Sequence, residues 1–250
     1  MTTVYLSGTL ITKDNIKIDY EHFRNGSDSI VIVCHGFFNS KKNRWIKKAV
    51  DIVSSSYDVL AFDFRGHGES SGRFSWTAKE YLDLETVIDY ARSYQSQGYK
   101  AIGILAFSLG AAISIVVASK RPDIKSMILI SCPYNFWNID FHFWEPEMFS
   151  DLKENFDCNW EGKGARVDSI FLPKERPIEC VSKIKGSSLF FIHGDKDWII
   201  KDYHSRLLYD SAKAEKKIEI IKDGLHAERL IQQYPDRIRE LTLNWFSQTL

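Results

Sequence analysis

The chain has 250 residues, of which 44% are hydrophobic and 26% are charged, the usual balance of a globular protein in water. Its 33 basic and 33 acidic residues give a formal net charge of +0, so composition supplies no electrostatic attraction to nucleic acid or to an anionic membrane. We therefore expect neither as a partner, and an α/β chain of this length is often a single domain.

The N-terminal residues, MTTVYLSGTLITKDN, carry no cationic start followed by an apolar stretch, so we expect no signal peptide. No apolar run approaches the roughly 18 residues that cross a bilayer. The cysteines Cys34, Cys132, Cys158 and Cys180 lack metal-ligand spacing, and small buried thiols are the simpler interpretation of the first two. The sequence thus predicts a cytoplasmic protein with no membrane span and no bound metal.

Short runs of β-branched and aromatic residues predict eight strands. The first two flank TKDN and should pair as an antiparallel hairpin, whereas most of the others alternate with helical patterns. Such alternation predicts a mainly parallel sheet with helices on both faces, here in one domain that spans 1–250. The expected strands are 4–11, 16–23, 30–34, 57–62, 101–107, 126–131, 188–193 and 217–221.

Helical patterns fill most of the connections between these strands. The segment TAKE fits a capping box in which Thr77 is the cap and Glu80 lies three residues later. A final helical region follows His226, and Pro235 should end or kink it. The other expected helices are 45–53, 81–91, 202–214 and one that follows Ser108.

The segment from Pro133 to Lys185 does not follow this rhythm. It comprises about fifty residues without clean periodicity, and so long an excursion inside a compact domain is usually functional. Because the segment is rich in aromatic residues, we expect a lid or pocket wall, with Trp137, Phe141 and Trp144 in a substrate pocket. The alternative is a decorative subdomain with its own small core.

Ser108 lies in the motif AFSLG, between an expected strand and an Ala- and Ile-rich run that predicts a buried helix. It could serve as the N-cap of that helix, a common role for serine. Alternatively, the motif is a form of the nucleophile elbow G-x-S-x-G, with Ala106 in place of the first glycine. Small residues at Ala106 and Gly110 would let strand and helix approach closely, so that the hydroxyl projects from the edge of the sheet. The strand–turn–helix context favours the elbow.

A serine hydroxyl is a poor nucleophile at neutral pH and needs a base that a third group orients. His226 follows the last expected strand through a short loop, which favours it as the base at the carboxyl edge of the sheet. His35 and His193 each precede a glycine at a strand end, where backbone and turn roles are the simpler interpretation. His67 lies in a loop that looks mobile.

The third group should follow the strand that ends at His193. Asp195 and Asp197, in HGDKD, both qualify. An Asp directly after a turn glycine commonly bonds to nearby backbone, which favours Asp197 as the acid that orients His226.

Two backbone N–H groups are needed to hold the oxyanion of acyl transfer. Leu109, which opens the helix after Ser108, supplies one. The other should come from HGFF, most plausibly from Phe37, since Gly36 would let that backbone turn inward. A plain strand-end turn with a hydrophobic anchor is the alternative for HGFF.

Together these motifs resemble those of the α/β-hydrolase superfamily. HGFF, DFRGHGESSG, AFSLG, HGDKD and GLH each lie where members of that family carry their counterparts, and the resemblance covers nearly the whole chain. FDFRGHGESSG, with an insertion before FFIHGDKD, is most similar to the branch of feruloyl (cinnamoyl) esterases, monoacylglycerol lipases and serine-aminopeptidase-like hydrolases. In family members the acid lies three residues after the glycine of the HG turn, which here is Asp197.

The resemblance implies an α/β-hydrolase fold with an inserted lid at about 133–185. It also implies an esterase in which Ser108, Asp197 and His226 cleave a small-molecule ester without a metal or an organic cofactor. An acyltransferase or thioesterase would use the same residues, and an aminopeptidase is less favoured because no acidic cluster in the insertion awaits a substrate amino terminus. A non-catalytic binding protein would show a broken triad. A homo-oligomer is possible.

Overall fold

The computed structural model describes residues 4–96, 98–139, 146, 148 and 164–250 of the chain. Within them lies an eight-stranded sheet, and each predicted strand is present to within one residue at either end. The strands are β1 (Val4–Ile11), β2 (Lys17–Arg24), β3 (Ser29–Cys34), β4 (Asp58–Phe62), β5 (Ala101–Phe107), β6 (Ser126–Ile130), β7 (Ser188–Gly194) and β8 (Lys216–Ile221).

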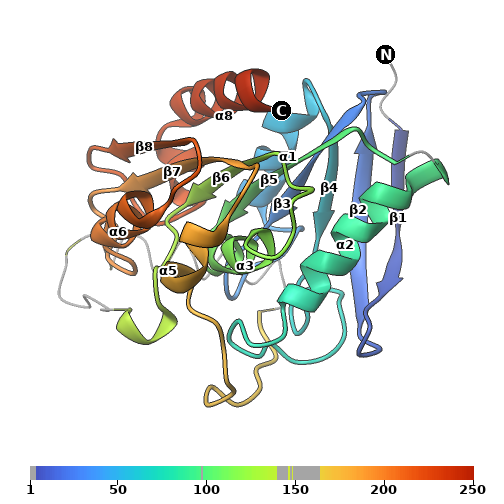
Figure 1. Ribbon diagram of the computed structural model, residues 1–250, viewed down its shortest axis with the longest axis horizontal. Coiled ribbons are helices and arrows are strands. Elements are labelled where there is room, and N and C mark those ends of the chain that lie inside the picture. The colour runs from blue at the N-terminus through green and yellow to red at the C-terminus, as the bar shows by residue number, and fades with distance from the viewer. Residues whose placement is uncertain (1–3, 97, 140–145, 147, 149–163) are drawn as a thin grey trace.

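The strand order across the sheet is β1-β2-β4-β3-β5-β6-β7-β8 (Figure 1). β1 pairs antiparallel with β2, and β2 pairs antiparallel with β4, whereas every neighbouring pair from β4 to β8 is parallel. The carboxyl ends of the parallel strands therefore meet at one edge of the sheet, where ligands bind in folds of this kind.

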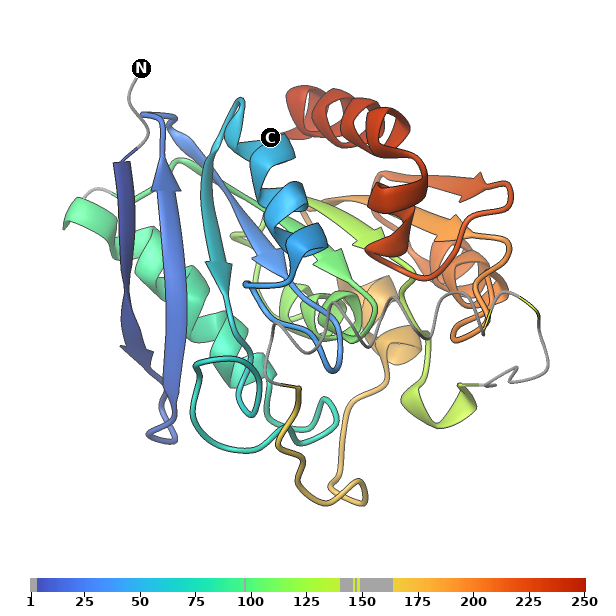
Figure 2. The same ribbon diagram turned by 180° about the vertical axis from the view of Figure 1, so that it is seen from behind.

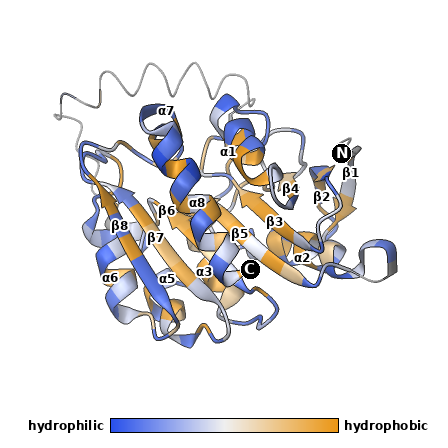
Figure 3. Cartoon of the chain, turned by 90° about the horizontal axis from the view of Figure 1, so that it is seen from above, coloured by the Kyte–Doolittle hydropathy of each residue, from blue (hydrophilic) through white to orange (hydrophobic). Residues whose placement is uncertain are grey.

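Helices cover both faces of the sheet, as the alternating pattern predicts (Figure 2, Figure 3). Pro235 begins the last helix and separates it from the one before, also as predicted. No helix among the residues that the structure describes is long and apolar enough to cross a membrane. The helices are α1 (Arg44–Ser54), α7 (Arg229–Gln233) and α8 (Pro235–Thr249) on one face, and α2 (Tyr81–Ser93), α3 (Leu109–Ala118), α5 (Pro177–Cys180) and α6 (Tyr203–Ser211) on the other, with short 3-10 turns η1 (Tyr94–Ser96), η2 (Phe136–Asn138) and η3 (Val181–Lys183).

The strand β3 shows how one short run supplies both cores. Ile30, Ile32 and Cys34 pack toward α2 and α3, whereas Val31 and Val33 pack toward α1 and α8. Each of the five is at most 1% exposed. Because successive side chains of a strand point to opposite faces, a strand that is covered on both faces has to be apolar throughout.

The helix α2 begins at Tyr81, and the capping box predicted at Thr77 and Glu80 is wrong. Thr77 has a φ of +75°, which is not the conformation of an N-cap residue. Instead, the backbone N–H of Ser75 donates to Glu80 Oε1 (2.6 Å), and the N–H of Lys79 donates to Ser75 Oγ (2.8 Å). The reciprocal bonds resemble a capping box but begin two residues earlier, and the spacing of residue types alone did not reveal this.

The predicted insertion 133–185 is described only in part. Near its end it lies against the glycine-rich loop that follows β4, through isolated bridges between His67 and Ala165 and between Phe74 and Val167. That the insertion is a lid stays a prediction. The described parts are 133–139, 146, 148 and 164–185.

Candidate active site

Ser108 lies on a strained turn between β5 and α3, with φ +52° and ψ −122°. A positive φ is costly for a residue with a side chain, and such residues cluster at functional sites. The turn is tight, because a Cβ atom on Gly110 would come within 2.3 Å of the carbonyl oxygen of His35. Ser108 occupies the N-cap position of α3, but its side chain makes no capping hydrogen bond there, so capping does not account for the hydroxyl.

Three side chains that lie far apart in the sequence meet at this turn. His226 Nε2 lies 3.0 Å from Ser108 Oγ, and His226 Nδ1 lies 2.6 Å from Asp197 Oδ2. A carboxylate can only accept, so Nδ1 carries the proton of the neutral ring and Nε2 accepts from the serine hydroxyl. Ser108 follows β5, Asp197 follows β7 and His226 follows β8, so parallel pairing brings all three to the same edge of the sheet. The structure thus brings together the three side chains predicted to act together.

The carboxyl group of Asp197 is fully buried and surrounded by donors. Its Oδ1 accepts from the backbone N–H groups of Ile199 (3.0 Å) and Ile200 (2.8 Å). Burial by itself opposes ionisation, but attraction to His226 and the hydrogen bond from His193 outweigh it and hold the pKa of Asp197 well below its usual range. The group is therefore an anion that can orient and stabilise an imidazole.

Asp195, the alternative acid, lies on the solvent side of the same loop. Its side chain is exposed, and its Oδ1 accepts from the backbone N–H of Asp223 (2.6 Å). It thus connects the loop after β7 to the loop after β8, and it is Asp197 that bonds to His226.

The two residues predicted to supply N–H groups for an oxyanion both lie in the wall of the pocket over Ser108. Phe37 and Leu109 line the same pocket as Ser108, and none of the residues that the structure describes accepts a hydrogen bond from either N–H. A Cβ atom on Gly36 would lie 3.1 Å from Ser108 Cβ, so the backbone after β3 packs directly against the serine. Both groups are therefore available to an oxygen atom bound at Ser108.

Two buried histidines shape the loop that carries Phe37. His35 Nε2 accepts from the N–H of Phe64 (3.0 Å), so its Nδ1 donates to the carbonyl of Gly36 (2.7 Å). The N–H of Phe38 donates to His67 Nε2 (3.1 Å). Burial lowers the pKa of His67 to about 3, which keeps its ring neutral and able to accept. The backbone role predicted for His35 is confirmed. The side chain of His67, which the sequence placed in a loop expected to be mobile, is 0% exposed.

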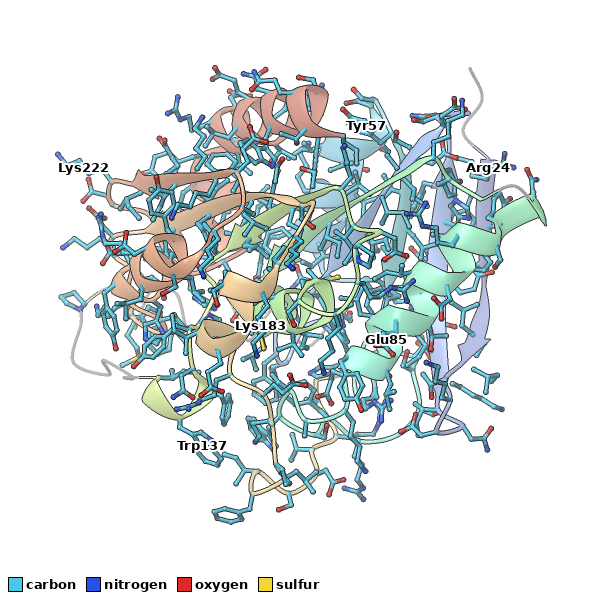
Figure 4. The ribbon with its side chains drawn as sticks, in the orientation of Figure 1. Arg24, Tyr57, Glu85, Trp137, Lys183 and Lys222 are labelled. Carbon is cyan, nitrogen blue, oxygen red and sulfur yellow. The ribbon has the colours of Figure 1, made fainter. Side chains whose placement is uncertain are left out.

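A pocket of about 510 Å³ opens over Ser108. Trp137 lines it as predicted, and Figure 4 shows this side chain projecting from η2 at the lower edge of the molecule. Phe141 and Trp144 lie outside the described residues. Sequence reasoning missed a pocket residue that is charged, Glu228, although it lies only two positions after His226. The wall also includes residues that the sequence did not assign to it, namely Phe38, Trp76, Ile170, Trp198 and Ile200.

Ser131 is a second residue that sequence reasoning missed. It follows β6 with a φ of +51°, and its Oγ accepts from the backbone N–H of Ala227 (2.9 Å), the residue after His226. The bond fixes the loop that carries the imidazole. A polar residue at the carboxyl end of a parallel strand was the available signal.

The strand order, the strained serine turn and the polar side chains at one sheet edge together define an α/β hydrolase. The family model described as alpha/beta hydrolase fold matches residues 29–164, and the chain belongs to that family. Among the residues that the structure describes, no group of three or more His, Cys, Asp or Glu side chains could hold a metal ion.

Three proteins that are similar to this chain carry different names. A solved structure of the esterase Pf2001 of Pyrococcus furiosus superposes with a TM-score of 0.78 at 25% identity, covering 99% of this chain and 93% of that chain. The uncharacterized protein YfhR of Escherichia coli O157:H7 is 27% identical over 222 residues, 88% of this chain and 70% of its own length. Ethanol acetyltransferase 1 of Cyberlindnera jadinii is 26% identical over 152 residues, 57% of this chain and 44% of its own length.

Proposed function

We propose that this protein is a serine hydrolase that cleaves carboxylic esters, with Ser108 as nucleophile, His226 as general base and Asp197 as the acid that orients the imidazole. The observation that carries the proposal is the hydrogen-bonded chain from Ser108 through His226 to a buried, ionised Asp197, at the floor of an apolar pocket. Membership of the α/β hydrolase family and similarity to an esterase support it.

The reaction follows from the geometry. His226 Nε2 takes the proton of Ser108 as its Oγ attacks the ester carbonyl, and Asp197 stabilises the imidazolium that forms. The N–H groups of Phe37 and Leu109 hold the negative charge on the carbonyl oxygen. His226 then protonates the leaving alcohol, and a water molecule releases the acyl group in a second cycle of the same kind. Each step uses only side chains and backbone of this chain, so the proposal includes no metal or organic cofactor.

The pocket suggests a small-molecule ester with an apolar acyl group. Its aromatic and aliphatic wall and its volume of about 510 Å³ suit a short-to-medium acyl chain or an aromatic acyl group of the feruloyl type. We include Trp137 in the acyl pocket, and the predicted roles of Phe141 and Trp144 remain part of this proposal.

A fluorophosphonate label, followed by mass spectrometry, tests the nucleophile. Wild-type protein should be labelled at Ser108, and Ser108→Ala should fold normally, resist the label and lose hydrolysis by several orders of magnitude. A panel of p-nitrophenyl esters of acetate, butyrate, octanoate and ferulate then maps the acyl preference. Labelling of another serine with Ser108 untouched, or no hydrolysis of any ester, would refute the proposal.

An acyltransferase is the second candidate, and the similarity to ethanol acetyltransferase 1 favours it. It would use the same residues with an alcohol in place of water. Partition of the acyl group between water and added ethanol separates the two. A hydrolase yields mainly free acid at modest ethanol concentrations, whereas an acyltransferase yields mainly the new ester.

A further inference from the structure

A second imidazole contacts the carboxylate of Asp197. His193 is the residue before the last in β7 and is 0% exposed. Its Nε2 lies 3.2 Å from Asp197 Oδ2, the same oxygen that bonds to His226 Nδ1 at 2.6 Å. The sequence suggested only a backbone or turn role for His193, and the mechanism above does not use it.

The partners of His193 determine where its proton lies. Its Nε2 is 2.7 Å from the carbonyl oxygen of Ile200, and a carbonyl can only accept, so Nε2 carries a hydrogen. In the neutral ring Nδ1 then accepts from Ser205 Oγ, at 2.6 Å, on α6. Both ring nitrogens are thus held, and Nε2, which donates to the carbonyl of Ile200, also contacts Asp197 Oδ2 at 3.2 Å.

We propose that His193 is a positioning residue for the triad acid: together with Ser205 it holds the carboxylate of Asp197 in the orientation that His226 requires. The proposal rests on the proposed serine hydrolase function. Oδ1 of Asp197 is fixed by the N–H groups of Ile199 and Ile200, and His193 Nε2 contacts Oδ2, the oxygen that bonds to His226. Functional side chains keep a productive geometry only where neighbouring residues hold them in place by packing and hydrogen bonds.

His193→Leu tests this, because it removes both ring nitrogens while keeping an apolar side chain in the buried site. Loss of the residues that orient metal-binding histidines typically costs about 10-fold to 100-fold in activity. By analogy, we expect kcat for p-nitrophenyl butyrate to fall about 10-fold to 100-fold in this variant. KM should stay within about twofold, since His193 does not line the pocket and the lost contact acts on the acid. His193→Gln, whose amide N–H can reach toward the position of Nε2, should recover most of the lost rate.

A double-mutant cycle with Asp197→Ala separates positioning from a general structural role. If His193 acts through Asp197, then His193→Leu should reduce kcat less than about twofold in the Asp197→Ala background. If the histidine only supports the loop through Ile200, the two losses multiply, and KM rises because Ile200 lines the pocket. All rates are normalised to the fraction of protein that reacts with fluorophosphonate, or to folded protein where Ser108 labels slowly.

His22→Leu is the matched control, because His22 is another fully buried histidine, on β2, bonded to Tyr99 rather than to the site. It should lower the melting temperature without changing kcat. If His193→Leu does not fold, Ser205→Ala removes only the partner of Nδ1 and should still lower kcat by about twofold to tenfold at unchanged KM.

Multiplicative losses in the cycle, or an unchanged kcat in both His193→Leu and Ser205→Ala, would overturn the inference while leaving the proposed function intact. A wild-type protein that reacts with neither esters nor fluorophosphonate would overturn both.

Discussion

Asp195 and Asp197 lie only two positions apart in the same loop, yet their surroundings differ. Asp197 is buried among N–H donors and bonds to His226, whereas Asp195 is exposed and bonds to backbone across the neighbouring loop. The same functional group is thus an orienting anion at one position and a connection between two turns at the other. The difference lies in which way each side chain leaves the turn after Gly194.

Asn substitutions at these two positions should therefore have unequal effects. Asp197→Asn keeps the shape but favours the wrong tautomer of His226, a change that costs about ten-thousandfold in a serine protease, and we expect a loss of kcat of about a hundredfold or more. Asp195→Asn can still accept from the N–H of Asp223 and should cost less than about tenfold. Steady-state kinetics on one ester checks both, and the reverse order would identify Asp195 as the acid.

At the scale of elements, the site depends on how closely α3 approaches the end of β3. The turn at Ser108 has room only for hydrogen at Gly110, because the carbonyl oxygens of His35 and Cys34 would lie 2.3 and 2.7 Å from a Cβ atom there. These are backbone atoms at the carboxyl end of β3 and directly after it, where packing opposes any displacement. The element that carries the serine and the element that leads to Phe37 are thus fitted to each other.

Gly110→Ala should destabilise the protein by about 2–3 kcal/mol and displace Ser108, so the rate of fluorophosphonate labelling should fall as well. Gly26→Ala is the control, because nothing lies within 4 Å of its Cβ position and only its φ of +91° opposes the substitution. It should cost about 1 kcal/mol and leave labelling unchanged. Urea unfolding and labelling kinetics measure the two effects, and equal losses in both variants would exclude the close contact as the cause.

The turn η2 presents Trp137 to the pocket while leaving the ring 52% exposed. A half-exposed ring contributes little to folding, so Trp137→Ala should change the free energy of unfolding by less than about 1 kcal/mol. Removal of the indole from the pocket wall should instead change the ratio of kcat/KM for octanoate and acetate esters severalfold. A lower melting temperature with an unchanged acyl preference would show that the segment is structural.

At the scale of the whole molecule, the fold buries several histidines in neutral form. Burial lowers the pKa of His22 to about 4 and that of His67 to about 3, and it also lowers the pKa of His35. These side chains lie on β2, in the loop after β4 and after β3, and all are at most 1% exposed. The folded state therefore binds protons less readily at these sites than the unfolded chain does.

The contribution of these histidines to stability should consequently fall as the pH is lowered. Well above pH 6.5, the ordinary pKa of histidine, neither state is protonated at these sites and their contribution is fully present. Below pH 6.5 the unfolded chain binds protons at these histidines and the folded chain does not. For His22 this lowers the free energy of unfolding by about 2 kcal/mol between pH 7.5 and pH 5. Urea unfolding of wild type and His22→Gln across this range should show the difference, with the wild type losing about that amount more stability than the variant. An identical decline in the variant would contradict the assignment.

Local patterns in the sequence predicted the eight strands, the break at Pro235 and the serine turn at Ser108. These features depend on residues close together in the chain: alternation on a strand, the missing N–H of proline and small residues around a tight turn. The meeting of Ser108, Asp197 and His226 could also be predicted from the sequence. The carboxyl ends of parallel strands lie at one edge of the sheet, whatever the order of the strands across it.

Other features were decided by the tertiary structure. Which strand lies beside which, the burial of His67, the contacts of His193 and Ser131, and the place of Trp76 and Trp198 in the pocket wall all depend on pairings across long stretches of chain. The capping bonds of Ser75 were missed for a related reason, since Thr77 and Ser75 are both suitable types and only the path of the backbone selects one. Residue type and spacing specify what a side chain can do, but its partner is set by packing, which sums many weak contacts over the whole fold.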